Sequence, residues 1–278
     1  MTQAELKRVV VCADDYALNA PVSQGIVALA VLGRLSATSV MSLSPRWAED
    51  AAALRDVRER MDVGVHLDWT SSFAIAAGHG SDLGTVMARS VLRLYNAQKI
   101  QHEMERQLDA FEAQWQAAPD HIDGHQHIQQ FAVFRDALAE VLMRRYGAND
   151  KRPWLRISRV AQPGFKAGVI SSFGARALHQ WAQHHAWPTV GPLLGAYGFG
   201  GSVDDYARQM QGWLAHLPAD TPALIMCHPA VSAQPDDAIG TARKREFAYL
   251  ASHDFVQQMF DAGVQLVRGS GKPMTEIN

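Results

Sequence analysis

Short runs of apolar residues alternate with longer amphipathic segments along this chain. The run at residues 8–13, RVVVCA, is rich in β-branched side chains and carries no charge after its first residue. Such runs are typical of strands that are buried on both faces of a parallel sheet. The pattern predicts strands at residues 8–13, 37–43, 62–67, 119–123, 154–157, 222–227 and 264–267.

The segments between these runs carry apolar residues three or four positions apart, the period of a helix that buries one face. In residues 21–32, for example, Val22, Ile26 and Leu29 share a face, and Gly33 follows as a stop signal. We predict helices at residues 21–32, 46–60, 86–117, 131–146, 171–185, 203–216 and 241–260. Strands that alternate with helices form parallel βαβ units, so we expect an α/β protein with a (β/α) barrel, irregular or seven-stranded. A doubly wound open sheet is the alternative.

The composition excludes several classes of protein. The 278 residues are 47% hydrophobic and 19% charged, with a formal net charge of −2, which suits a single domain over residues 1–278. No basic cluster indicates a nucleic-acid partner, and no run of about 18 apolar residues predicts a membrane span. Residues 1–8 lack the apolar core of a signal peptide, and Cys12 and Cys227 lie in apolar runs typical of reduced, buried thiols. We therefore expect a cytoplasmic protein, and a homodimer remains open.

Polar side chains gather where four of the predicted strands end. Asp14 and Asp15 follow the first strand, His66 lies at the end of the third, and His228 follows a later one. The segment 121–127, HIDGHQH, holds three histidines and a carboxylate at alternate positions, which a continuous strand would point to one side. Because the C-terminal ends of parallel strands meet at one rim of a barrel, we expect these groups to form a metal-dependent active site there.

These segments resemble the motifs of YdjC-like carbohydrate deacetylases, a family that includes the chitooligosaccharide deacetylases and the hopanoid-biosynthesis-associated members. The matching segments are VCADDY at 11–16, GVHL at 64–67, HIDGHQH at 121–127 and CHP at 227–229. The resemblance runs from about residue 8 to at least residue 250. It implies a barrel-like fold, one divalent metal ion, and hydrolysis of the N-acetyl group of a small-molecule sugar substrate.

The resemblance also implies a role for each matching residue. Asp15, His66 and His125 would be the metal ligands, Asp14 the catalytic base and His228 the general acid. The sequence departs from the family pattern in three places: Cys12 stands where Asn is usual, Tyr-Ala where Phe-Gly is usual at 16–17, and Gln129 where a further His is frequent. None of these changes removes an implied ligand, so the chemistry is retained while the choice of sugar is open.

Other polar and aromatic residues are expected around these groups. Asp123 could accept the free ring N–H of a ligating histidine, His127 is expected beside the ligands or at the rim, and Arg156 could bind Asp14 by a charge-assisted bond. Arg243 is the weaker candidate, and we expect it in a surface salt bridge. Aromatic residues in the loop segments 71–84 and 162–201 are expected to stack on the apolar faces of a sugar.

The predicted ligand set leaves open positions at a metal, where a carbonyl can be polarised and the pKa of a water molecule lowered toward about 7. Two nitrogens and one oxygen do not decide between Mg and Zn. The alternatives are another metal-dependent amide hydrolase, an Fe(II)-dependent oxygenase with the same ligand types, and a catalytically silent carbohydrate-binding protein. Silent binding requires neither Asp14 nor His228, so the presence of both favours an enzyme.

Overall fold

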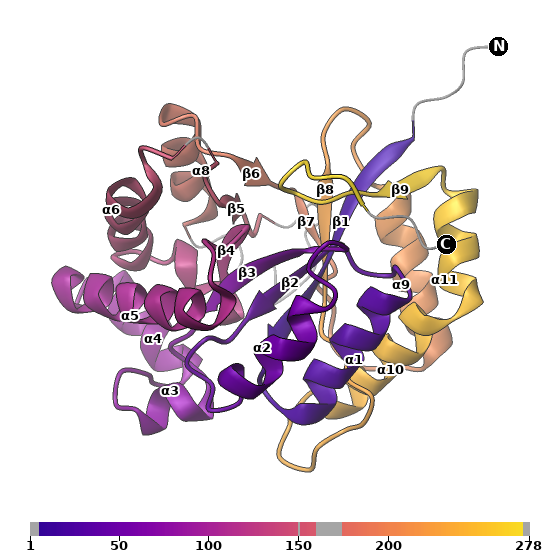
Figure 1. Cartoon of the computed structure of the whole chain (residues 1–278), viewed down its shortest axis with the longest axis horizontal. Coiled ribbons are helices and arrows are strands. Elements are labelled where there is room, and N and C mark those ends of the chain that lie inside the picture. The colour runs from indigo at the N-terminus through magenta and orange to yellow at the C-terminus, as the bar shows by residue number, and fades with distance from the viewer. Residues whose placement is uncertain (1–5, 150, 160–173, 275–278) are drawn as a thin grey trace.

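The computed structural model describes residues 6–149, 151–159 and 174–274, and there it forms a parallel sheet surrounded by helices (Figure 1). The strands are β1 (Lys7–Tyr16), β2 (Ala37–Val40), β3 (Asp62–Leu67), β4 (His121–Gly124), β5 (Trp154–Arg156), β6 (Thr189–Val190), β7 (Leu193–Leu194), β8 (Ala223–Cys227) and β9 (Val264–Leu266). The helices are α1 (Ala20–Val31), α2 (Trp47–Arg55), α3 (Ser72–Ala76), α4 (Leu83–Val91), α5 (Ala97–Trp115), α6 (Phe134–Tyr146), α8 (Ala175–His184), α9 (Val203–Ala215), α10 (Gly240–Ala251) and α11 (His253–Asp261), with a 3-10 helix, η1 (His125–Gln130).

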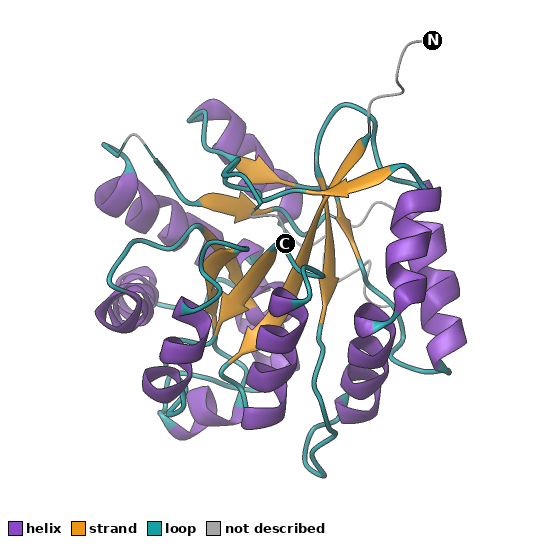
Figure 2. Cartoon of the chain, turned by 45° about the vertical axis from the view of Figure 1, so that its right-hand side comes forward, coloured by secondary structure: helices purple, strands orange, loops and turns teal. Residues whose placement is uncertain are grey.

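The strand pairings are parallel and follow the order β6-β5-β4-β3-β2-β1-β8-β7, with β9 also paired to β1. The two end strands, β6 and β7, are consecutive in the chain, so the sheet curls back toward itself. Helices lie along the outside of this curved sheet (Figure 2). The prediction of an irregular (β/α) barrel is confirmed.

The alternation of side chains along β1 separates two parts of the core. Val9, Val11 and Ala13 pack with the helices in the larger apolar cluster, whereas Val10 and Cys12 belong to a smaller cluster built almost wholly from strand residues. The smaller cluster fills the inner side of the curled sheet, as expected for the interior of a small barrel. Asp14 continues the period of positions 10 and 12, which brings it to the mouth of that interior.

Two of the predicted helices were wrong in length, because each is a pair of helices. The segment 86–117 is broken before Asn96, whose side chain accepts a hydrogen bond from the Lys99 N–H and starts α5. Ser252 separates α10 from α11, and its hydroxyl accepts from the Phe255 N–H. In each pair, both helices bury their apolar face in the same core. The spacing of apolar residues therefore continues across the capping residue, so the sequence pattern does not reveal the break.

The remaining predictions agree with the structure to within a few residues, except that α2 ends at Arg55 rather than at residue 60, and that α3, η1, β6 and β7 were not predicted. The first residues of the predicted helix at 171–185 lie outside the described part of the chain. None of the described helices combines the length and apolar character that crossing a membrane requires.

Candidate active site

The strands carry the predicted site residues to one end of the sheet. Asp14 and Asp15 lie in β1, His66 in β3, Asp123 in β4, Arg156 at the end of β5, and His228 directly after β8. A cavity of about 700 Å³ opens at this end. Its lining includes Asp14, Asp15, His66, His125, His127 and His228.

An irregularity near the end of β1 turns both aspartates toward this cavity. The pairing with β2 shifts register between Ala13 and Tyr16, and Asp15 has a left-handed backbone with φ 68°. In a regular strand, neighbouring side chains point to opposite faces. A bulge re-aims a side chain, and here Asp14 and Asp15 face one cavity while keeping different partners.

Asp15, His66 and His125 form a cluster of potential metal ligands. The Asp15 Oδ1 atom lies 3.4 Å from His66 Nε2 and 3.0 Å from His125 Nδ1. One ligand atom from each residue lies within 4.8 Å of the other two. The other carboxylate oxygen, Oδ2, accepts a hydrogen bond from Arg243 Nη2 at 2.7 Å. Two histidines from distant segments therefore lie against one oxygen of the Asp15 carboxylate, and an arginine from a third segment binds the other oxygen.

The charges around this cluster favour a cation. Burial would raise the pKa of the Asp15 carboxyl, but Arg243 and His125 outweigh it and hold that pKa well below its usual value. Burial would lower the pKa of His66, but the Asp123 carboxylate outweighs it and raises that pKa to about 10. His66 thus lies between two carboxylates that favour a positive charge, and a divalent cation could take the place of the proton.

Asp14 has a separate set of partners. Arg156 donates from Nη1 to Asp14 Oδ1 at 2.7 Å and from Nη2 to Asp14 Oδ2 at 2.9 Å. This two-point contact fixes the plane of the carboxylate. His228 Nε2 lies 3.9 Å from Asp14 Oδ2, so an aspartate and a histidine face each other across the cavity floor. The predicted bond between Arg156 and Asp14 is confirmed.

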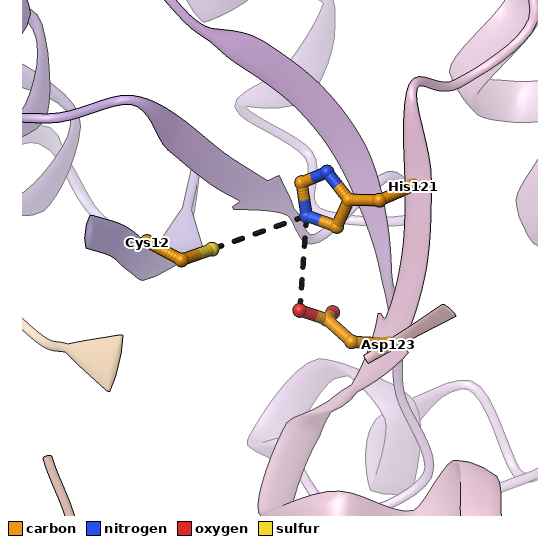
Figure 3. Close-up of side chains that lie close together, drawn as sticks. All are labelled: Cys12, His121 and Asp123. Atoms are coloured by element: carbon orange, nitrogen blue, oxygen red, sulfur yellow. Dashed lines mark hydrogen bonds and ion pairs between the residues drawn. The ribbon is translucent and has the colours of Figure 1, made fainter. Parts of the chain in front are cut away.

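A buried layer beneath the cavity holds Asp123 in place. Its Oδ1 lies 2.6 Å from His66 Nδ1, and its Oδ2 accepts from Ser39 Oγ at 2.5 Å and lies 2.9 Å from Arg156 Nη2. Figure 3 shows the ring of His121 between Cys12 and Asp123. The predicted contact of Asp123 with a candidate ligand, which fixes the ring orientation of His66, is confirmed.

His121 occupies space that a glycine leaves free. Its ring stacks on Trp154 with the centroids 4.2 Å apart, and a Cβ atom at Gly64 would overlap the ring. Burial lowers the pKa of His121, and burial raises the pKa of the Cys12 thiol, so both groups are neutral. The predicted free, buried thiols of Cys12 and Cys227 are confirmed.

Residues 121–127 do not form one continuous strand, in agreement with the strand predicted at residues 119–123. The strand ends at Gly124, and Gln126 and His127 have left-handed backbones with φ 53° and 63°. This turn brings His125 to Asp15 and places His127 in the cavity lining, without the alternation that a strand would impose. Burial, together with the nearby Arg156 charge, lowers the pKa of His127 to about 3, so its ring is neutral.

The family model described as YdjC-like protein matches residues 8–261. The chain belongs to the YdjC-like protein family. Two relatives named carbohydrate deacetylase are each 25% identical: one from Mus musculus over 82% of this chain and 79% of the relative, and one from Homo sapiens over 93% and 89%. A solved Enterococcus faecalis structure, named for cellobiose-phosphate cleavage, superposes with a TM-score of 0.72 at 20% identity, covering 95% of this chain and 98% of the other. The likeness to that structure shows the fold alone.

Arg243 of this YdjC-like protein contacts the candidate ligand Asp15. We expected it in a surface salt bridge, but it is 3% exposed and binds both Asp15, at 2.7 Å, and Asp237, at 2.6 Å. It lies on α10, where a basic residue is typical of the solvated face. Only the tertiary position of that helix, which packs against α1 and α9, brings Arg243 to the cavity.

Aromatic and aliphatic side chains form part of the cavity wall in this YdjC-like protein. Phe73, Tyr197 and Phe199 line it, as the aromatic content of the two loops predicted, and Leu18 and Ile239 contribute aliphatic surface. Trp187 belongs to the main core, and Trp181 packs against it. Residues 162–173 of the second loop segment lie outside the described residues.

Proposed function

We propose that this protein is a metal-dependent carbohydrate N-deacetylase. The observation that carries the proposal is the convergence of Asp15, His66 and His125, from three separate parts of the sheet, beside Asp14 and His228. The two relatives named carbohydrate deacetylase support the choice of reaction. The aromatic wall formed by Phe73, Tyr197 and Phe199 supports a sugar as the bound group, because sugar rings have apolar faces.

The residues present fit a divalent cation. Asp15 Oδ1 is buried and has no hydrogen-bond partner in the described structure, although two imidazole nitrogens lie within 3.4 Å of it. Such an oxygen is costly to bury unless something positive binds it. One carboxylate and two imidazoles form a ligand set that suits Zn and also accepts Mg, so the proposal leaves the metal undecided between these two.

Asp15, His66 and His125 would hold the cation, which when bound would polarise the acetyl carbonyl and make a water molecule more acidic. Asp14 would accept a proton from the water molecule that attacks the acetyl carbon. Its carboxylate is oriented for this by the two bonds from Arg156. Proton transfer to a positioned carboxylate of this kind contributes about 10²- to 10⁴-fold to the rate.

His228 would supply the second proton. In its imidazolium form it would donate from Nε2 to the amide nitrogen as the C–N bond breaks, which releases acetate and a free amino sugar. The 3.9 Å between His228 Nε2 and Asp14 Oδ2 supports an acid and a base that act on one reacting group. Asp123 would keep His66 Nδ1 protonated and turn Nε2 toward Asp15.

The proposal is tested by measuring acetate released from N-acetylglucosamine oligomers and N-acetylated glycolipids by protein loaded with Mg or Zn. We expect release that stops when the metal is removed with EDTA and returns when it is restored. His125→Ala should neither hold one metal per chain nor release acetate. Absence of acetate from the whole substrate panel at either metal would contradict the proposal.

A further inference from the structure

Glu246 on α10 is a fully buried carboxylate that the reaction described above does not use. Its Oε2 accepts a hydrogen bond from the backbone N–H of His228 at 2.5 Å. Its Oε1 accepts from the phenol of Tyr197 at 2.7 Å. Within the described residues, Glu246 forms no ion pair. The Glu246 carboxylate therefore links the candidate acid, His228, to Tyr197 of the aromatic wall through two hydrogen bonds from uncharged donors.

Burial of this group is costly. Burial raises the pKa of Glu246, an effect that His228, Tyr197 and Arg243 only partly offset. A buried charge adds little to stability compared with a well-packed apolar residue. Charged groups kept in such positions beside a cavity are frequently functional, so the two partners of Glu246 indicate what it does.

The partners of Glu246 form one continuous surface of the cavity. The ring of Tyr197 lies 4.9 Å from that of Phe199, and the ring of Phe199 lies 5.5 Å from that of His228. The neighbouring Arg245 donates to the backbone carbonyls of Phe199 and Gly201. Two adjacent residues of α10 thus hold the loop that carries the wall, and one of them also holds the segment that carries His228.

We propose that Glu246 is a positioning residue that sets the placement of His228 relative to the Tyr197 and Phe199 wall. This inference rests on the proposed function, in which the wall binds the sugar and His228 protonates its departing amine. A carboxylate serves both partners because it only accepts hydrogen bonds. Glutamine at this position could accept one of the two bonds and would turn an NH₂ group toward the other donor.

The test compares Glu246→Gln with Lys244→Gln, a matched change at an exposed position on the same helix. Kinetics are measured on an N-acetylglucosamine oligomer, whose amine must be protonated to leave, and on 4-nitrophenyl acetate, whose phenolate needs no proton. For Glu246→Gln we expect kcat on the oligomer to fall about 10- to 100-fold, part of the contribution of a positioned acid. Activity on the ester and bound metal should change little, and Lys244→Gln should match wild type.

Equal losses on the two substrates would show a general structural role and overturn the inference. Tyr197→Phe removes one partner only, so it should raise KM for the oligomer more than it lowers kcat. An unchanged KM would contradict the link between Glu246 and the wall. If Glu246→Gln does not fold, Glu246→Asp replaces it, and this shortened carboxylate should show the same selective loss on the oligomer.

Backbone hydrogen exchange separates this inference from the proposed function. Loss of the Glu246 carboxylate should speed exchange in residues 227–231 and 196–201 together, and leave residues 121–124 unchanged. This result would support the positioning role even if wild-type protein released no acetate, a result that would overturn the proposed function alone. Unchanged exchange in both segments would overturn the inference whatever the activity.

Discussion

The strand-borne half of the site and its helix-borne half are built on different principles. The strand-borne half comprises Asp14, Asp15, His66, Asp123 and Arg156, which lie toward the C-terminal ends of buried parallel strands. The helix-borne half comprises Arg243, Arg245 and Glu246 on α10. Each of these three reaches a different segment: the Asp15 bulge, the loop at Phe199, and the start of the segment after β8. The strands supply the proposed ligands and proton acceptor together with Asp123 and Arg156, which orient them, and the helix adds further orienting contacts.

This difference implies that changes in the two halves should have different consequences. A change at Asp14, Asp15 or His66 would remove a proposed ligand or proton acceptor, whereas a change on α10 would displace a group that is still present. Metal content, metal affinity and kcat, measured together, therefore separate the two halves.

Asp15→Asn should have the largest effect. The amide keeps the size of the side chain but removes the negative charge on which His66, His125 and Arg243 converge. We expect metal content to fall from one equivalent to near zero and acetate release to fall to background with it. Elemental analysis and an acetate assay measure both, with the exposed Asp204→Asn as control. A full equivalent of metal in Asp15→Asn would exclude Asp15 as a ligand.

Asp14→Asn should have the next largest effect and a different profile. The variant loses the proton acceptor but none of the proposed ligands, so we expect it to keep its metal while kcat falls about 10²- to 10⁴-fold. Arg156 would then lose its two-point contact, which a circular-dichroism melt would detect as a lower Tm. If Asp14→Asn empties the metal site while Asp15→Asn stays loaded and slow, the two roles are reversed.

The two halves also differ in how far they could be predicted from sequence. Asp14, Asp15, His66 and His228 were found because uninterrupted apolar runs mark buried strands, and parallel strands bring their ends together. The left-handed turn at Gln126 and His127 was not foreseen, because period-two spacing is equally compatible with a strand. Spacing alone cannot reveal where a strand stops pairing.

The helix-borne half could not be found in this way. Arg243 lies 228 positions from Asp15, and charged residues on an amphipathic helix are typical of a solvated surface. Their burial depends on how α10 packs against α1 and α9, which no local pattern encodes. The available signal was the run of charged residues at Arg243, Arg245 and Glu246. Consecutive residues point to different sides of a helix, so these three cannot all lie on one solvated face.

A pair of lysine substitutions tests the difference between the two halves of the site, and we expect effects of intermediate size. Arg243→Lys and Arg156→Lys keep the charge but lose the planar fork that makes two directed bonds. Arg243→Lys should loosen Asp15 and weaken Zn²⁺ binding by about tenfold, as changes around metal ligands usually do. Arg156→Lys should lower kcat and leave Zn²⁺ affinity nearly unchanged. Calorimetric titration with Zn²⁺ and saturation kinetics measure the two quantities, and identical profiles for both variants would remove the distinction.

Ser39→Ala should have the smallest effect on the reaction. Its hydroxyl donates to Asp123 Oδ2 at 2.5 Å and lies 3.0 Å from His121 Nε2. Its loss therefore removes one donor from Asp123, which still contacts Arg156, and a close partner from His121. We expect the free energy of unfolding to fall by about 1–3 kcal/mol and Zn²⁺ affinity to fall only a few-fold.

Ser36→Ala is the matched control, because Ser36 is equally buried but accepts from the Val11 N–H and does not bond to Asp123. Similar destabilisation in both variants, with weaker Zn²⁺ binding in Ser39→Ala alone, would place Ser39 in the chain of contacts that orients His66. Equal Zn²⁺ affinities would limit Ser39 to a role in stability.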